Sequence, residues 1–186
     1  ILPARTKLSR GHHKAEPYLS VPQMLTQLRS RRAVAALALE FTILTAARTG
    51  EVIGATWNEI DIDRAVWTIS AERMKAGREH RVPLSKRAIE ILQNVKMLNA
   101  SHVFPGNKGG PLSQMAMSML LRRMKTDVTV HGFRSSFRDW AAESTIFPHE
   151  VCEMALAHAV AGRVEAAYRR GDLFEKRRRL MDEWAT

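Results

Sequence analysis

The longest apolar stretch of the sequence, AVAALALEFTILTAA at residues 33–47, restricts the fold more than any other feature. It contains a single charged residue, Glu40. A helix that is apolar on all sides is buried, so we expect a buried helix over about residues 31–47. The stretch is shorter than the roughly 20 residues that span a bilayer, and no other apolar run is longer. We therefore expect no membrane partner.

The remaining periodicity predicts a mainly α (α+β) domain with a small three-stranded antiparallel sheet. Residues 65–70 (AVWTIS) and 80–84 (HRVPL) are β-like, and Gly77 lies in the turn between them, which indicates a hairpin. WNEIDIDR at 57–64 is a candidate third strand. Residues 1–17 show no period and are expected to be a linker leading into the domain at 18–186. Helices are expected to begin at the capping residues Ser20, Ser85 and Ser113, and to cover 51–55, 85–98, 113–125, 131–143, 148–157 and a last segment from about Asp172.

The sequence is strongly basic. Its 186 residues include 29 Lys and Arg against 19 Asp and Glu, a formal net charge of +10. Such a field favours a polyanionic partner, most often nucleic acid, and arginine, which predominates here, suits phosphate contacts. The single cysteine, Cys152, excludes a disulfide framework and a cysteine zinc site. We expect one cytoplasmic domain with a sizeable core.

Several polar residues along the chain suit a phosphodiester. His131 and Arg134 lie three apart at the start of an expected helix, where two donors can meet one anion. Taken singly, an arginine at a helix end, a lysine in a turn or a histidine in the core needs no function. The whole set is Arg48 in ARTGE, Lys75 at the hairpin tip, His131 and Arg134 in HGFR, His158 in LAH, and Tyr168 in VEAAYRRGD.

The order and spacing of these six residues resemble those of the tyrosine recombinases, also called phage-type integrases. The similarity is closest to integrases of prophages and genomic islands, and covers about residues 20–184. Two departures stand out: Ala157 replaces the glycine of the frequent Leu-Gly-His, and Tyr168 follows His158 by ten residues where many members have nine. Both occur in the island-type branch, so neither argues against activity. The stretches that carry the resemblance are ARTGEVIGATWNEID (47–61), VTVHGFRSSFRDWAAE (128–143) and LAHAVAGRVEAAYRRGDLFEKRRRLM (156–181).

The resemblance implies site-specific DNA recombination through a 3′-phosphotyrosyl intermediate formed by Tyr168. Arg48, Arg134 and the two histidines, His131 and His158, would contact the non-bridging oxygens. Lys75 would protonate the leaving 5′-oxygen. Glu51 is expected to orient Arg48 or the hairpin. The catalytic residues implied are thus Arg48, Lys75, His131, Arg134, His158 and Tyr168.

The resemblance also bears on partners. It implies double-stranded DNA with attachment sites, no cofactor, and a homotetramer on DNA for the full-length protein, and it allows a monomer for this fragment. Family members clamp DNA with a further N-terminal region, and the chain, which starts at Ile1, is expected to be an excerpt. No metal site is expected, because the sequence lacks HExxH and a carboxylate cluster.

Two alternatives stay open at this stage. One is a type IB topoisomerase, which uses similar catalytic groups; the other is a basic DNA-binding module without catalysis. The final helix can dock on its own core or on a neighbouring protomer. Generic candidates for DNA contact are Arg73, Arg78, Lys108, Arg122, Arg123 and Lys125.

Overall fold

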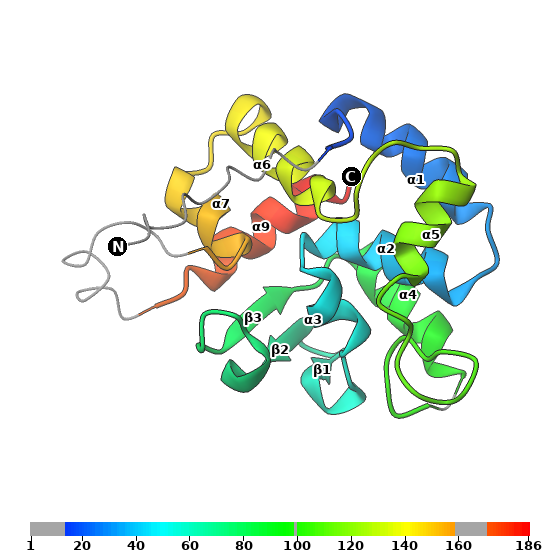
Figure 1. The fold of residues 1–186 in the computed structure, drawn as a ribbon. Coiled ribbons are helices and arrows are strands. Elements are labelled where there is room, and N and C mark those ends of the chain that lie inside the picture. Colours follow the sequence, from blue (N-terminus) through cyan, green and yellow to red (C-terminus); the bar gives the residue numbers. More distant parts are fainter. Residues whose placement is uncertain (1–13, 99, 159–170) are drawn as a thin grey trace, which may run out of the picture.

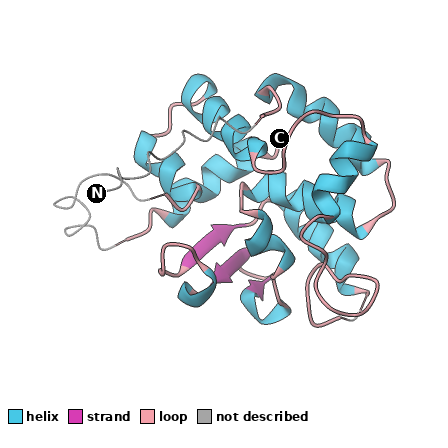
Figure 2. Cartoon of the chain, in the orientation of Figure 1, coloured by secondary structure: helices cyan, strands magenta, loops and turns pink. Residues whose placement is uncertain are grey.

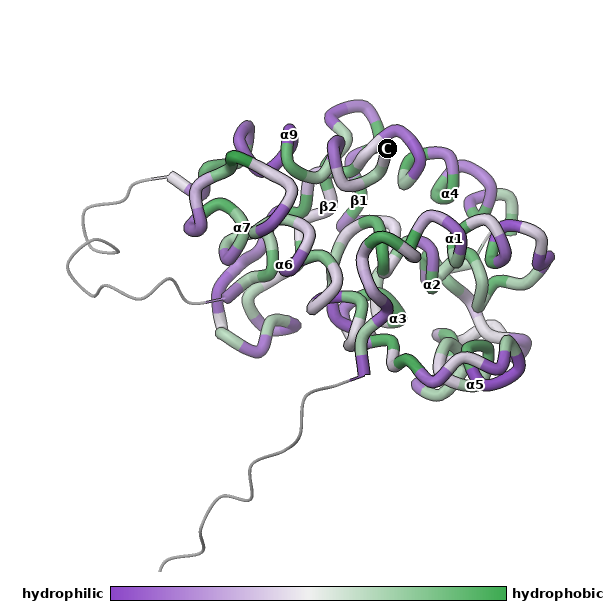
Figure 3. Tube along the Cα trace, turned by 90° about the horizontal axis from the view of Figure 1, so that it is seen from above, coloured by the Kyte–Doolittle hydropathy of each residue, from purple (hydrophilic) through white to green (hydrophobic). Residues whose placement is uncertain are grey.

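In the computed structural model, residues 14–98, 100–158 and 171–186 are described. The apolar stretch forms α2 (Val34–Thr45), which is buried along most of its length. Figure 1 shows α2 in the middle of the molecule, and in Figure 3 hydrophobic segments gather around it. Its neighbours explain why it needs no polar face. They are α1 (Val21–Arg29), α3 (Thr49–Ile53), α4 (Lys86–Lys96), α5 (Ala116–Arg123) and α9 (Phe174–Trp184).

The one charge inside α2 is paired. Glu40 is almost completely buried and accepts hydrogen bonds from Arg29 Nε at 2.7 Å and Arg87 Nε at 2.8 Å. Burial alone would raise the pKa of Glu40, but the hydrogen bonds from Arg87 and Arg29 outweigh it and hold the pKa below its usual value. Glu40 therefore ties α2 to α4 and to the end of α1.

The sheet has the expected three antiparallel strands, in the order β1 (Ile60–Asp61), β2 (Val66–Ile69), β3 (His80–Pro83) (Figure 2). Trp67 of β2 lies opposite Ile60 and Val82 and is fully buried. Its ring packs 5.5 Å from that of Phe41 on α2. This contact fixes the sheet, and the turn at its end, relative to the central helix.

Helix starts agree only in part with the sequence prediction. Ser85 caps α4 by accepting from the backbone N–H of Ala88. Ser20 precedes α1, but it belongs to a 3₁₀ turn (Tyr18–Ser20) and its side chain makes no capping bond. Ser113 is not the cap of α5, which begins three residues later at Ala116; its hydroxyl closes the preceding turn instead. A serine supports turns as readily as caps, so its presence alone does not fix a helix start.

A second part of the core joins α6 (Gly132–Ser144), α7 (His149–Ala155) and α9. Leu180 and Met181 of α9 are buried there. The Trp184 indole donates to the backbone carbonyl of Ile43 at 2.8 Å and packs edge-to-face against the ring of Phe137. In this structure the final helix therefore docks on its own domain.

Part of the expected linker also packs on the domain. The carbonyl of Lys14 accepts from the Thr129 backbone at 2.9 Å, and the Ser136 hydroxyl donates to the carbonyl of Glu16. Residues 14–16 thus lie against the start of α6. Among the described residues, no helix is long and apolar enough to cross a membrane.

The docking of α9 gives a stability prediction. Leu180→Ala should lower the free energy of unfolding by about 2–5 kcal/mol, because it opens a cavity between α6, α7 and α9. Glu183→Ala, on the exposed side of the same helix, should change it by less than about 0.5 kcal/mol. Urea denaturation of the two variants provides the comparison, and equal, small effects would show that α9 does not dock on its own core in solution.

Candidate active site

The end of α2 places Arg48. The helix stops at Ala46, whose backbone is left-handed with φ of 49°, and the chain turns into α3 with Arg48 as the residue before its first turn. One oxygen of the Glu51 carboxylate accepts from the Arg48 backbone N–H and the other from its guanidinium, both at 2.8 Å. The contact agrees with the expectation that Glu51 orients Arg48. Three quarters of the Arg48 side chain is buried, so its direction is restricted.

Arg134 lies deeper, on the first turn of α6, with only 6% of its surface exposed. One terminal nitrogen donates to the backbone carbonyl of Ala46, at the end of α2. The other donates to the carbonyl of Leu156, at the end of α7, at 2.7 Å. A single guanidinium thus joins the carboxyl ends of two helices, where free carbonyls and the helix dipoles favour a cation.

His158 completes this cluster. Its Nε2 lies 3.1 Å from the Arg134 guanidinium, and its Nδ1 lies 2.8 Å from the Glu153 carboxylate. Arginine only donates, so Nε2 must accept and the ring proton must be on Nδ1, pointing at Glu153. Arg138 binds the other oxygen of Glu153 at 2.8 Å. Glu153 therefore orients His158, a role that the sequence prediction missed. The signal that could have found it is the position of Glu153 on α7, five residues before the histidine.

His131 stands at the start of α6, on the exposed side, three residues before Arg134. The glycine between them is required by a close approach. A Cβ on Gly132 would overlap the carbonyl oxygen of Lys14 and lie 2.8 Å from the Cα of Ala15. The HGFR motif therefore combines an imidazole and a guanidinium with a position over which the incoming chain passes.

Lys75 is exposed in the turn between β2 and β3. Its neighbours Met74 and Ala76 line a hollow whose walls also include His158 and Arg177. The turn therefore borders the same space as the histidine.

Tyr168 lies outside the described residues, which resume after it at Gly171. Asp172 is held by two arginines, one on the sheet and one on α9. Arg81 of β3 donates to both of its carboxylate oxygens, at 2.8 and 3.0 Å, and the buried Arg177 donates to one of them at 2.7 Å. Asp172 and His158, on the two sides of the undescribed segment, line the same hollow.

The electrostatics show a dense positive cluster. Burial first, and then the charge of Arg48, lower the pKa of Arg134 to about 10. Burial, Arg177 and Arg48 lower the pKa of His80 on β3 to about 4, although Glu51 and a hydrogen bond to the Ala155 backbone act in the opposite direction. His80 is thus neutral at physiological pH and serves as a link between β3 and α7. An anion near Arg48 and Arg134 would relieve the repulsion between them.

Arg73, a generic candidate for DNA contact, has another role. Its guanidinium binds the Glu59 carboxylate and, at 2.6 Å, the backbone carbonyl of Glu51. Its terminal nitrogens therefore join the Glu59 carboxylate to the main chain of α3. This pairing was not predicted from the sequence, since Glu59 lies 14 residues earlier.

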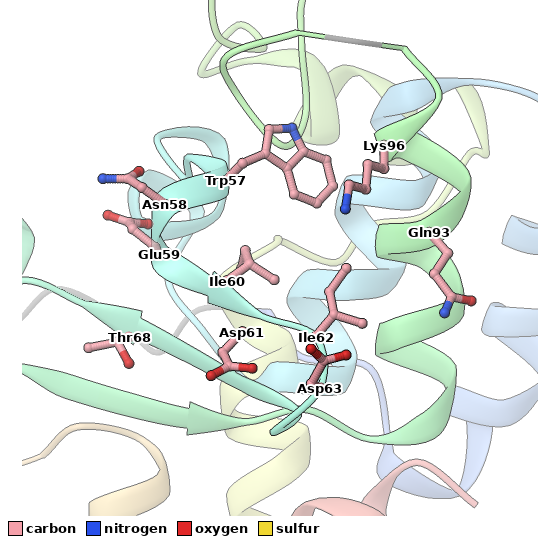
Figure 4. Close-up of a pocket in the computed structure, with 10 residues that line it drawn as sticks. All are labelled: Trp57, Asn58, Glu59, Ile60, Asp61, Ile62, Asp63, Thr68, Gln93 and Lys96. Atoms are coloured by element: carbon pink, nitrogen blue, oxygen red, sulfur yellow. The ribbon is translucent and has the colours of Figure 1, made fainter.

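No group of three or more His, Cys, Asp or Glu side chains able to hold a metal ion occurs among the described residues. A second hollow lies between the β1 segment and α4 (Figure 4), and none of the predicted catalytic residues that the structure describes lines it. Its walls are Trp57, Asn58, Glu59, Ile60, Asp61, Ile62, Asp63, Thr68, Gln93 and Lys96.

Comparison with known proteins identifies the family to which this fold and cluster belong. The model of the phage integrase family matches residues 19–172. The chain belongs to this family, which confirms the resemblance found in the sequence.

Two curated relatives illustrate the similarity. The prophage integrase IntA of Escherichia coli K12 is 34% identical over 176 residues, covering 88% of this chain and 42% of the relative. The integrase of Enterobacteria phage P4 is 31% identical over 195 residues, covering 93% of this chain and 44% of the relative. The chain therefore spans less than half the length of these relatives.

Solved structures support the fold. An integrase from mycobacterium phage Brujita superposes with a TM-score of 0.70 at 17% identity, covering 97% of this chain and 61% of that one. A lambda integrase (75–356) dimer bound to a COC′ core site gives a TM-score of 0.64 at 19% identity, with coverage of 84% and 61%. The mainly helical domain with a small antiparallel sheet is thus the fold of integrases.

Arg134 gives the prediction for this site. Arg134→Ala should lower the free energy of unfolding, because the carbonyls of Ala46 and Leu156 would each lose a donor at about 1–3 kcal/mol per buried group. Arg64→Ala removes only the exposed ion pair with Asp61 and should cost less than about 1 kcal/mol. Urea denaturation distinguishes the two; if both variants unfold alike, Arg134 does not join the helix ends.

Proposed function

We propose that this chain is the catalytic domain of a tyrosine recombinase that integrates or excises a prophage or genomic island. The observation that carries the proposal is the convergence of Arg48, Arg134 and His158 at the ends of α2 and α7, within a chain of the phage integrase family. Tyr168 is the proposed nucleophile.

The first requirement of the reaction is to neutralise the phosphate. A tyrosine hydroxyl has a pKa near 10 and is rarely ionised at neutral pH, so attack by Tyr168 on an anion needs cationic help. Arg48 and Arg134 supply fixed positive charge whose positions are set before DNA arrives. Hydrogen bonds from charged donors contribute about 1.5–3 kcal/mol each and raise the rate where they tighten in the transition state.

The second requirement is proton transfer. The Tyr168 oxygen forms a bond to phosphorus while the bond from phosphorus to the 5′-oxygen breaks, leaving a 3′-phosphotyrosyl ester and a free 5′-hydroxyl. The tyrosine proton passes to a base, for which His131 is the candidate, and Lys75 gives the 5′-oxygen its proton. The ester conserves the bond energy, so rejoining needs no nucleotide cofactor.

His158 supports this cluster through its hydrogen bonds. With its Nδ1–H held by Glu153, its Nε2 faces Arg134 and the space where the phosphate would lie. It can accept from the guanidinium in the free enzyme and donate to a phosphate oxygen once protonated at Nε2.

The partner proposed for the site is double-stranded DNA carrying the attachment sequence of the element, in the cytoplasm of a bacterial cell. The lambda integrase structures include a dimer bound to a core site and a tetramer bound to a Holliday junction. We extend this to the protein here as a homotetramer on DNA. Its net charge of +10 suits such a partner.

Tyr168→Phe tests the nucleophile. The variant should bind DNA as the wild type does, because it loses one hydroxyl and no charge, and it should form no covalent adduct with a nicked duplex carrying the attachment sequence. Tyr18→Phe is the matched control, since Tyr18 is the only other tyrosine in the sequence. Its hydroxyl donates to Glu143 at 3.0 Å, and Glu143 is not one of the proposed catalytic residues. Denaturing gels reveal the adduct.

An adduct with Tyr168→Phe would contradict the assignment, and no adduct with the wild type would favour a DNA-binding module without catalysis. Relaxation of supercoiled DNA lacking the attachment sequence would favour a type IB topoisomerase. Wild-type cleavage should continue in the presence of a chelator; loss that added magnesium restores would indicate a metal-dependent nuclease instead.

The charge gives a further prediction. The DNA affinity of this chain should fall about 10³-fold or more between roughly 50 and 200 mM salt if six or more phosphates are contacted. Titration of a labelled duplex at several salt concentrations measures the slope. A binding constant that is insensitive to salt would argue against a surface that follows the phosphate backbone.

A further inference from the structure

Arg73 occupies a connecting position between two parts of the active site. It ends the short 3₁₀ turn Ala71–Arg73 that follows β2, two residues before Lys75. Its guanidinium binds the Glu59 carboxylate on one side and the backbone carbonyl of Glu51 on the other. The side chain is three quarters buried, so these bonds are largely shielded from water.

The Glu59 side of this contact is rigid. Only 9% of the Glu59 side chain is exposed, and the same carboxylate accepts from the indole of Trp67 at 3.1 Å. Trp67 is fully buried in β2. In Figure 4, Glu59 points away from the side of its segment on which Trp57 lies. Arg73 is therefore bound to a group that the core holds in place.

The other side of the contact is the helix that positions Arg48. Glu51 binds Arg48 through its side chain and Arg73 through its main-chain carbonyl. Gly54, at the end of α3, makes room for this: a Cβ there would lie 2.9 Å from the Arg73 terminal nitrogen. The guanidinium thus lies across the end of α3.

The chain passes from buried to exposed between Met74 and Lys75. Met74 is buried, whereas Lys75 is exposed in the turn. Two residues of extended chain span at most about 7 Å, so the Lys75 Cα stays within that distance of the Arg73 Cα. A proton donor must reach its acceptor within hydrogen-bond distance, and a misplacement of about 1 Å can cost about 10²-fold in rate.

We propose that Arg73 is a positioning residue that fixes the base of the β2–β3 turn, and with it Lys75, against the helix that carries Arg48. The inference rests on the proposed function, in which Lys75 is the general acid. Arg73 does not touch DNA in this role. It sets the range over which the lysine can move, while Arg48 and the acid remain at a defined separation.

The test uses a substrate that does not need an acid. Replacing the bridging 5′-oxygen by sulfur makes the leaving group a thiolate. Because its conjugate thiol has a pKa near 8.5, the thiolate leaves without taking up a proton. With the full chain in single turnover, Lys75→Ala should slow cleavage of the ordinary substrate by about 10²–10⁴-fold and that of the sulfur substrate much less. Arg73→Met should show the same pattern at about 10²-fold, and the double variant should be no slower than Lys75→Ala alone.

Two further variants separate positioning from folding and charge. Gly54→Ala keeps every charged group and pushes the flexible end of Arg73 from the Glu51 carbonyl, so it should give a smaller loss that sulfur also rescues. Arg64, in the β1–β2 turn, is an exposed arginine paired with Asp61. Its replacement, Arg64→Met, should leave both cleavage rates within a few-fold of the wild type. Urea denaturation and DNA titration accompany each variant.

The outcomes distinguish a wrong acid assignment for Lys75 from a wrong positioning role for Arg73. If sulfur fails to rescue Lys75→Ala, the acid assignment in the proposed function is wrong. If sulfur rescues Lys75→Ala but neither Arg73→Met nor Gly54→Ala, or if the double variant is slower than Lys75→Ala, Arg73 does not position the lysine. Weaker DNA binding with a shallower salt slope in Arg73→Met would make Arg73 a phosphate contact and overturn the proposal.

Discussion

The guanidinium of Arg134 is the interaction on which the site depends. It binds the last carbonyls of two helices that come from distant parts of the sequence, at Ala46 and Leu156, and it touches His158. Without it, the carboxyl ends of α2 and α7 would meet with unsatisfied acceptors and aligned negative dipole ends. Under the proposed function, the residue that binds the phosphate is also the one that holds the two helix ends together. Such a double role explains why a full positive charge is kept in a position with so little solvent.

The electrostatic arrangement follows from the same geometry. Arg48 is close enough for its charge to lower the pKa of Arg134, while Glu51 on α3 binds Arg48 and Glu153 on α7 binds His158. These carboxylates hold Arg48 and His158 in position through hydrogen bonds. An incoming anion then meets donors that need little rearrangement, which is the condition under which fixed charges contribute most to catalysis.

The sequence predicted the architecture well, because local patterns carried it. The apolar stretch around Glu40 predicted the central helix, and Gly77 between two β-like runs predicted the hairpin. The order of six polar residues predicted the family. The contact of Arg73 with Glu59 was not predicted, because it depends on how the sheet and its turns fold together. The contact of Glu153 with His158 was missed although the two residues lie only five positions apart. Capping was uncertain for another reason, since Ser113 supports a turn where a helix start was expected. The place of Tyr168 lies outside the described residues and stays a prediction.

The contact of residues 14–16 with α6 has a practical consequence for isolating the domain. These residues cover Gly132, and their carbonyls receive hydrogen bonds from Thr129 and Ser136. A recombinant fragment that began at Tyr18, where the first helical turn starts, would leave those donors facing solvent beside His131 and Arg134. Expression of the catalytic domain should therefore begin upstream of Lys14. The few residues before the first helix are therefore part of the packed domain as well as the connection into it.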